Sequence, residues 1–228
     1  AFPHHTNEIA QSESYLGHKW CNYWFHVHHL NTDGGKMSKS KGEFLTVSLL
    51  EEKGYDPMVY RMFCLQSHYR RNLVFSWENL DNAAAAYEKL IAKIATLRDE
   101  GGIEPMMFAD LKKRFAKALE GDLNTSVAVT AVYDVLKAKT TDATKLALIA
   151  DFDKVLCLNL LAAAENLRKK QAEEEAANAD PEIDALVAAR TEAKKAKNWA
   201  EADRIRDELK ARGIEIIDTP QGAKWRKV

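Results

Sequence analysis

The chain has 228 residues and a nearly balanced charge, with 33 lysines and arginines against 34 aspartates and glutamates. Its 46% hydrophobic residues and mean hydropathy of −0.40 exclude a disordered or membrane-embedded protein. No apolar run reaches the roughly 20 residues of a membrane span, and no signal peptide opens the chain. Three isolated cysteines, Cys21, Cys64 and Cys157, favour a cytoplasmic, reducing setting. Because the overall charge is balanced, any polyanion site has to be a local patch.

The first 45 residues hold six of the seven histidines, so candidate site chemistry is concentrated there. A short helix is predicted from His4 to Tyr15, with Pro3 near its start and Gly17 beyond its end. The aromatic and β-branched residues 23–30 predict a strand, and residues 31–35 predict a turn. The chain begins without methionine and with dense polar chemistry, so we expect it to be the back part of a longer protein.

From Thr46 onward the signals are helical. Thr46 is predicted to cap a helix that Gly54 ends, and the pair Asp56-Pro57 is predicted to open a second helix that runs to Leu65. Ser76 is predicted to cap a third helix, whose apolar face carries Leu80, Ala84, Tyr87, Leu90, Ile91 and Ile94.

The second half of the chain predicts a helical region followed by a small hairpin. Between Met106 and Asp180 we expect three amphipathic helices, with breaks near residues 121–122 and 140–142. The acidic stretch 171–180 is interpreted as a hinge or as a solvated helix end. A helix is then expected over residues 182–212 with a break near Asn198. Gly213 ends it before a hairpin of residues 214–217 and 224–227 around a turn at 218–222.

A loop rich in lysine and serine carries the sharpest chemical signal. It contains Lys36, Met37, Ser38, Lys39 and Ser40 and precedes a predicted helix. Ammonium and hydroxyl groups one residue apart can wrap a triphosphate and neutralise the charge that grows on departing pyrophosphate. On composition alone, the loop can equally be a solvated basic segment.

Near the start of the chain, His4 and Glu8 are four residues apart. On a helix, side chains at this spacing leave from one face and can ligate a single metal ion. A capping histidine beside a surface glutamate has the same spacing, so the residues alone leave both interpretations open.

Five sequence segments stand out together. In chain order they are FPHHTNEIAQSE (2–13), KMSKS (36–40), HYRRNLVFSWENL (68–80), GDLNTSVAV (121–129) and IIDTPQGAKWR (216–226). KMSKS is similar to the second signature of class I aminoacyl-tRNA synthetases. The ordered set of segments resembles one family of these enzymes, the cysteinyl-tRNA synthetases.

The resemblance implies a mainly α fold with an α/β part, divided into four regions. They are the tail of a Rossmann-like catalytic domain with the KMSKS loop (1–45), a connecting α-rich segment that contacts the tRNA stem (46–75), a tRNA-binding helical bundle (76–178) and a C-terminal α+β unit for anticodon recognition (179–228).

The resemblance also implies an activity. Cysteine and ATP, supplied with magnesium, form cysteinyl adenylate, and the cysteinyl group then passes to the terminal ribose of the tRNA for cysteine. Lys39 would stabilise the transferring phosphates with support from Lys36, and Met37, Ser38 and Ser40 would complete the ATP-binding loop. His4 and Glu8 would hold zinc together with two upstream cysteines, and zinc would select the substrate thiolate. The implied protein is a cytoplasmic monomer with no membrane partner.

Two features of that family are missing from this sequence. The first is the H-x-G-H motif, which binds ATP in the family. The second is the pair of cysteine zinc ligands, which lie upstream in the family, and Cys21 does not occupy either position. His26-Val27-His28-His29 lacks the glycine of the H-x-G-H motif and is not a substitute for it. We therefore expect the chain alone to be inactive.

The C-terminal residues are the candidate reader of RNA. Residues 181–228 contain eleven basic and nine acidic side chains, an excess that also suits a solvated helix face. Trp199 and Trp225 are possible platforms on which bases stack, although Trp199 can equally be a core residue. By resemblance, Lys194, Asp203 and Asp218 lie where the family contacts anticodon bases, and Asp218 can alternatively stabilise its turn.

Two other functions remain open from the sequence. A related ligase that couples cysteine to an amino sugar would keep the zinc helix and KMSKS, but the 216–226 string argues against it. A stand-alone RNA-binding module without catalysis would explain the missing ATP-binding string.

Overall fold

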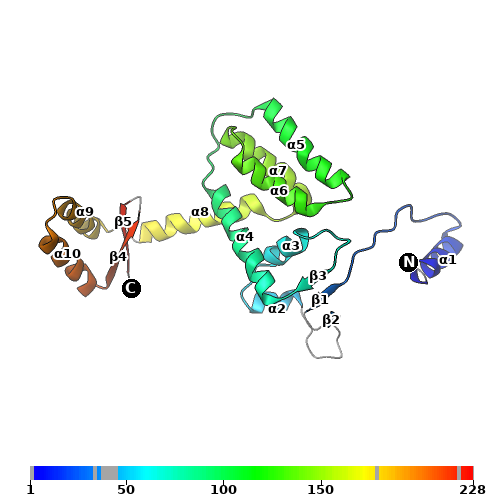
Figure 1. Cartoon of the computed structure of the whole chain (residues 1–228), viewed down its shortest axis with the longest axis horizontal. Helices are drawn as coiled ribbons and strands as arrows, with labels where there is room; N and C mark the ends of the chain where they lie inside the picture. Colours follow the sequence, from blue (N-terminus) through cyan, green and yellow to red (C-terminus); the bar gives the residue numbers. More distant parts are fainter. Residues whose placement is uncertain (1–2, 33–34, 37–45, 178–179, 220–221, 228) are drawn as a thin grey trace. The chain divides into compact units, whose positions relative to one another are not determined.

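A computed structural model of the chain describes residues 3–32, 35–36, 46–177, 180–219 and 222–227 (Figure 1). Within these ranges there are ten helices and five short strands, which confirms the predicted mainly α fold with a small α/β part. The chain forms two compact units, Ala1–Leu161 and Ala162–Val228. Among the helices described, none has the length and apolar character of a membrane span.

The first helix, α1, covers His4–Leu16, close to its predicted bounds. Gly17 ends it with a φ of 72°, a conformation that glycine adopts without a steric penalty, and its N–H donates to the carbonyl of Glu13 at 2.8 Å. No side chain of α1 is buried.

The strand predicted over residues 23–30 is wrong for all but Leu30. Residues 23–29 form no regular secondary structure, and the side chains of Tyr23 and Val27 are 91% and 60% exposed. The segment meets its neighbours at isolated points, such as the bond from the His28 N–H to the carbonyl of Tyr69 at 3.0 Å. Strand propensity reflects packing on a half-buried sheet surface, and these side chains find no such surface here.

A three-stranded sheet follows, in the order β2-β1-β3. Strand β1 (Leu30–Thr32) pairs antiparallel with β2 (Gly35–Lys36). Residues 33–34, at the centre of the predicted turn, lie outside the described residues. Strand β1 also pairs in parallel with β3 (Leu73–Phe75). Parallel strands require a long crossover, and helices α2 (Val47–Glu52) and α3 (Pro57–Leu65) lie within it.

The predicted caps of the next helices are confirmed. The Thr46 hydroxyl accepts a bond from the Leu49 N–H at 3.1 Å, and the Asp56 carboxylate accepts one from the Met58 N–H at 2.8 Å. Ser76 caps α4 (Trp77–Ala95) through the N–H of Asn79 at 3.1 Å. The buried stripe of α4 matches the prediction except that Ala83 replaces Ala84; it contains Leu80, Ala83, Tyr87, Leu90, Ile91 and Ile94.

In the described chain between α4 and Asp180 there are four helices, not the predicted three. They are α5 (Pro105–Glu120), α6 (Thr125–Lys137), α7 (Asp142–Leu156) and α8 (Leu160–Ala177), and α5, α6 and α7 pack pairwise around buried Phe152 (Figure 1). The two predicted breaks are present.

The additional break lies at residues 157–159, where Cys157 and Asn159 have φ values of 50° and 57°. The Asp153 carboxylate stabilises this corner by accepting bonds from the N–H groups of Leu158 at 2.7 Å and Leu160 at 2.9 Å. The break was missed because residues 157–159 include neither glycine nor proline.

The second unit builds a small α+β core of its own. Helix α8 continues through residues 171–177, where residues 171–174 are exposed, as expected for a solvated helix end. Helices α9 (Pro181–Lys195) and α10 (Trp199–Ala211) pack on each other and on the hairpin of β4 (Ile214–Thr219) and β5 (Gly222–Lys227). The break at Asn198 and the stop at Gly213 are as predicted. The core contains Ile183, Val187, Ile205, Leu209, Ile214 and Trp225.

Candidate functional site

The loop rich in lysine and serine begins at the edge of the small sheet. The backbone of Lys36 forms the end of β2, in register with Asn31 of β1. Met37, Ser38, Lys39 and Ser40 lie outside the described residues. The role of this loop in binding ATP therefore stays a prediction, and the sheet supplies its point of attachment.

Helix α1 carries both predicted metal ligands at its start, four residues apart and exposed. An imidazole nitrogen and a carboxylate oxygen are donors that zinc accepts, so His4 and Glu8 fit half of a tetrahedral site. In the described part of the chain, no three histidine, cysteine, aspartate or glutamate side chains gather as a metal site. Two donors alone are too few, so zinc retention requires ligands from elsewhere.

A polar cluster lies instead around Asp122, between α5 and α6. One oxygen of its carboxylate accepts a bond from the Tyr69 hydroxyl at 2.5 Å, and the other meets Arg70 Nε at 2.7 Å. His68 Nε2 lies 3.0 Å from the Asp122 carbonyl oxygen. This cluster joins two of the strings singled out in the sequence, residues 68–80 and 121–129.

The electrostatics of this cluster favour the charged carboxylate. Hydrogen bonds from Tyr69 and then Arg70 hold the pKa of Asp122 below its ordinary value. The same carboxylate raises the pKa of the Tyr69 hydroxyl, so Tyr69 remains a donor at neutral pH. The cluster therefore links chain segments through charge-assisted hydrogen bonds and is not a proton-transfer site. We call these residues, His68, Tyr69, Arg70 and Asp122, the Asp122 joint.

Tyr69 extends this joint to the segment that follows α1. Its ring stacks on Phe25 with centroids 4.3 Å apart, and its carbonyl accepts the bond from the His28 N–H. Further along, the Thr125 hydroxyl reaches the carbonyl of Ser67 at 3.4 Å. Three separate stretches of the chain thus meet at one tyrosine.

In the second unit, the predicted RNA contacts lie on different elements. Lys194 lies in the last turn of α9, and Asp203 lies on α10, where it forms an ion pair with Arg206 at 3.0 Å. Asp218 lies on β4, opposite Ala223, rather than in the turn where the sequence placed it. The three residues thus lie on α9, α10 and β4, which belong to one compact unit.

The two tryptophans of this unit have opposite environments. Trp225 is 9% exposed in the core, and its indole Nε1 donates to a carboxylate oxygen of Asp184 at 2.7 Å. Trp199 is 60% exposed at the start of α10, so the core role considered for it is wrong. The ring accessible to a stacking base is therefore that of Trp199, whereas Trp225 packs the hairpin against α9.

Comparisons with known proteins identify the family. Residues 1–85 match the model of the tRNA synthetases class I (C) catalytic domain, and residues 177–226 match that of the cysteinyl-tRNA ligase anticodon binding domain. A protein of Symbiobacterium thermophilum named cysteine-tRNA ligase is 41% identical over 240 residues, 99% of this chain and 50% of that protein. The chain belongs to the cysteine-tRNA ligase family.

Two further relatives of the same name agree. The cysteine-tRNA ligase of Halorhodospira halophila is 42% identical over 236 residues, 99% of this chain and 49% of the relative. That of Brevibacillus brevis is 38% identical over 249 residues, 99% of this chain and 50% of the relative. The chain thus spans about half the length of the cysteine-tRNA ligases it matches.

The Asp122 joint was not predicted as a functional feature of this family member. The sequence marked the segments 68–80 and 121–129 separately, as segments similar to the family. Nothing in their composition indicated that they contact each other. Asp122 and Leu123 adopt φ values of 60° and 52°, which are uncommon for residues other than glycine. The Asp122 bonds offset the cost of this backbone conformation.

We predict that Asp122→Asn destabilises the chain at pH 7 and has little effect at low pH. Because the folded-state pKa is depressed, the carboxylate stabilises the fold above the unfolded pKa of about 3.9, and this contribution is lost as pH falls through the folded pKa. Urea unfolding of both proteins between pH 7 and about pH 2.5 measures the difference. Asp134→Asn, on the exposed face of α6, is the control. An equal loss at all pH values would contradict the charge-assisted joint.

We predict opposite outcomes for the two tryptophans. Trp225→Ala should cost about 3–5 kcal/mol of stability because it empties the core of the second unit. Trp199→Ala should change stability by no more than about 0.5 kcal/mol, since its ring is exposed. Denaturant unfolding followed by circular dichroism measures both. Comparable losses for the two variants would show that Trp199 also packs a core.

Proposed function

We propose that the chain is part of an enzyme that uses ATP to join cysteine to its tRNA. One observation carries this proposal: a single chain matches the catalytic domain over residues 1–85 and the anticodon binding domain over residues 177–226, in that order. The reaction has two steps, the formation of cysteinyl adenylate with release of pyrophosphate, and the transfer of the cysteinyl group to the terminal ribose of the tRNA.

The loop at the end of β2 supplies the phosphate chemistry in this proposal. Lys39 neutralises the charge that develops on the departing pyrophosphate, and Lys36 supports the loop. Met37, Ser38 and Ser40 complete the contact with ATP, which binds with magnesium. The pairing of β2 with β1 supports this assignment because it anchors the loop to a sheet rather than to a free segment.

Helix α1 supplies part of the amino-acid site. His4 and Glu8 would hold zinc together with two thiolates that this chain does not provide. Zinc prefers sulfur to oxygen, and when bound it would distinguish the thiolate of cysteine from the hydroxyl of serine. The exposure of both side chains on one face of α1 supports this role, since neither is committed to a core.

The second unit reads the tRNA in this proposal. Lys194, Asp203 and Asp218 contact anticodon bases, with Trp199 as the accessible aromatic ring and Trp225 as a packing residue. The proposed division of the chain is a catalytic tail (1–45), a connecting segment (46–75), a tRNA-binding bundle (76–178) and the anticodon unit (179–228). The protein acts as a monomer in the cytoplasm.

Two alternatives have less support. A ligase acting on an amino sugar has no use for an anticodon binding domain, which residues 177–226 match. A stand-alone RNA-binding module has no use for a class I catalytic domain, which residues 1–85 match. Because H-x-G-H is missing from the 228 residues, we expect them alone to catalyse no cysteine-dependent exchange of pyrophosphate into ATP.

We predict that Lys39→Ala, in a protein of the relatives' full length, lowers kcat more than it raises KM for ATP. A charge-assisted contact present mainly in the transition state should be worth about 2–4 kcal/mol. Steady-state pyrophosphate exchange gives both constants, and Lys41→Ala controls for the loss of a nearby positive charge. A change in KM alone would assign Lys39 to ground-state binding.

We predict that Asp203→Ala selectively weakens recognition of the anticodon. Hydrogen bonds to base edges carry sequence information, so discrimination against a tRNA altered at one anticodon position should fall by about 1–3 kcal/mol. Aminoacylation kinetics with both tRNAs measure this, while pyrophosphate exchange should stay near normal. Asp207→Ala is a matched control because Asp207 also contacts Arg206, at 3.3 Å. Equal effects of both variants would refute base reading by Asp203.

A further inference from the structure

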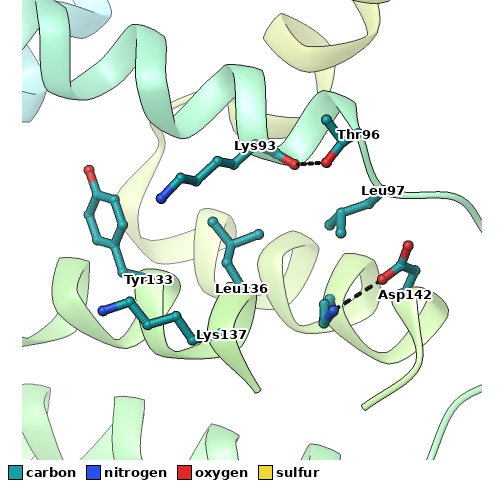
Figure 2. Close-up of a pocket in the computed structure, with 8 residues that line it drawn as sticks. Lys93, Thr96, Leu97, Tyr133, Leu136, Lys137 and Asp142 are labelled. Carbon is teal, nitrogen blue, oxygen red and sulfur yellow. Dashed lines mark hydrogen bonds and ion pairs between the residues drawn. The ribbon is translucent and has the colours of Figure 1, made fainter. Parts of the chain in front are cut away.

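A pocket of about 400 Å³ lies in the first unit, among the C-terminal ends of α4 and α6 and the first turn of α7 (Figure 2). Leu97 and Leu136 line it with apolar surface, and the side chain of Tyr133 forms one wall. Lys93, Lys137 and Lys145 also line it, with Asp142 as the one carboxylate on its wall. A volume of this size lies at the lower end of the range found for ligand sites.

The carboxylate on the wall is already engaged. Asp142 forms an ion pair with Lys145 at 3.1 Å and accepts a bond from the Arg98 N–H at 3.1 Å. The Arg98 N–H, and then Lys145, hold the pKa of Asp142 below its ordinary value, so it stays charged at neutral pH. Asp142 therefore cancels Lys145 and leaves the other two lysines uncompensated.

Lys93 and Lys137 form no ion pair with any carboxylate of the described residues, and both are exposed. Figure 2 shows that Lys93 from α4 and Lys137 from α6 both carry their ammonium groups to the Tyr133 side of the pocket. Both lysines line a pocket that is partly apolar, and no carboxylate among the described residues of its wall is left to balance their charge. A bound anion would balance it.

A simpler role explains part of this arrangement. Lys93 and Lys137 lie in the last turns of α4 and α6, where positive charge stabilises the helix dipole. Lys117 lies in the last turn of α5 and serves the same purpose without lining the pocket. The dipole accounts for a lysine at each helix end, but it does not require that two such lysines line the same pocket.

We propose that this pocket binds a phosphate group of the RNA backbone. Two ammonium groups can donate to the oxygens of one phosphodiester, and the remaining volume leaves room for the ribose beside it. The inference rests on the proposed function, which supplies the RNA. A phosphate contact carries no sequence information, so the pocket positions the tRNA while the second unit reads its bases.

The first experiment compares the double variant Lys93→Gln/Lys137→Gln with the matched variant Lys117→Gln in the full chain. Binding of the tRNA for cysteine is measured from about 50 to 200 mM salt. Each lost phosphate contact should lower the slope of log affinity against log salt by about one, so we expect a fall of about one to two for the double variant. We expect the same fall with a tRNA altered in its anticodon. Circular dichroism checks that both variants fold alike.

The second experiment titrates the chain with inorganic phosphate and follows the NMR signals of the Leu97 and Leu136 methyl groups. Shifts that the double variant loses and Lys117→Gln keeps would support the pocket as a phosphate site. Shifts of this kind combined with unchanged RNA binding would overturn the backbone proposal in favour of free phosphate. A double variant that matches Lys117→Gln in both experiments would overturn the site itself.

These outcomes are separate from a failure of the proposed function. A chain that does not prefer its cognate tRNA would refute anticodon reading in the second unit. The salt slopes would still differ between the double variant and Lys117→Gln if the pocket holds backbone phosphate.

Discussion

In the first unit, the Asp122 carboxylate is a polar contact that links segments far apart in the sequence. It lies at the corner between α5 and α6, in a left-handed backbone conformation, and it accepts bonds from Tyr69 and Arg70 on the segment before β3. Tyr69 in turn holds Phe25 and the backbone of His28. A single ionised group therefore connects the stretch after α1, the small sheet and the helices α5–α7. The charged acceptor strengthens the two bonds from Tyr69 and Arg70, and Tyr69 passes the connection on to Phe25 and His28 through its ring and its carbonyl.

The second unit is held together by a small apolar core and by a hydrogen bond from a buried tryptophan. The core of this unit is small, and the Trp225 side chain packs within it. The indole Nε1 of Trp225 donates a hydrogen bond to the carboxylate of Asp184 on α9, so the buried N–H has a partner. This bond ties β5 to the start of α9 and fixes the orientation of the hairpin that carries Asp218. The exposed side chains of α10, including Trp199 and Asp203, do not contribute to this core. A rigid core beneath exposed polar and aromatic side chains is a sound support for reading single-stranded bases. Backbone phosphate binding, placed between α4, α6 and α7, would separate positioning from reading.

Local signals predicted most of the helices because capping chemistry is short-range. Thr46, Asp56 and Ser76 each cap the helix that the sequence assigned to them, since a side-chain oxygen and an N–H two or three residues later suffice. The errors lie where a distant partner decides. The strand expected at residues 23–29 needs a neighbouring strand, and none is beside it in the described chain. The break at residues 157–159 depends on Asp153, which reaches forward past the end of its own helix.

The sequence by itself indicated the family and the mainly α character, and it marked residues 36–40 as the candidate phosphate loop, because sequence motifs and helix caps depend on neighbouring residues. It also marked His4 and Glu8, through their spacing on one helical face. Only the tertiary structure decided that Trp225 packs a core while Trp199 is exposed, and that Asp218 belongs to a strand. It alone brought Asp122 to Tyr69 and Trp225 to Asp184, and it placed Lys93 and Lys137 on the wall of one pocket. The residues of each of these pairs are more than 40 positions apart in the sequence, and their distance in space is set by the packing of whole helices, which no local pattern encodes.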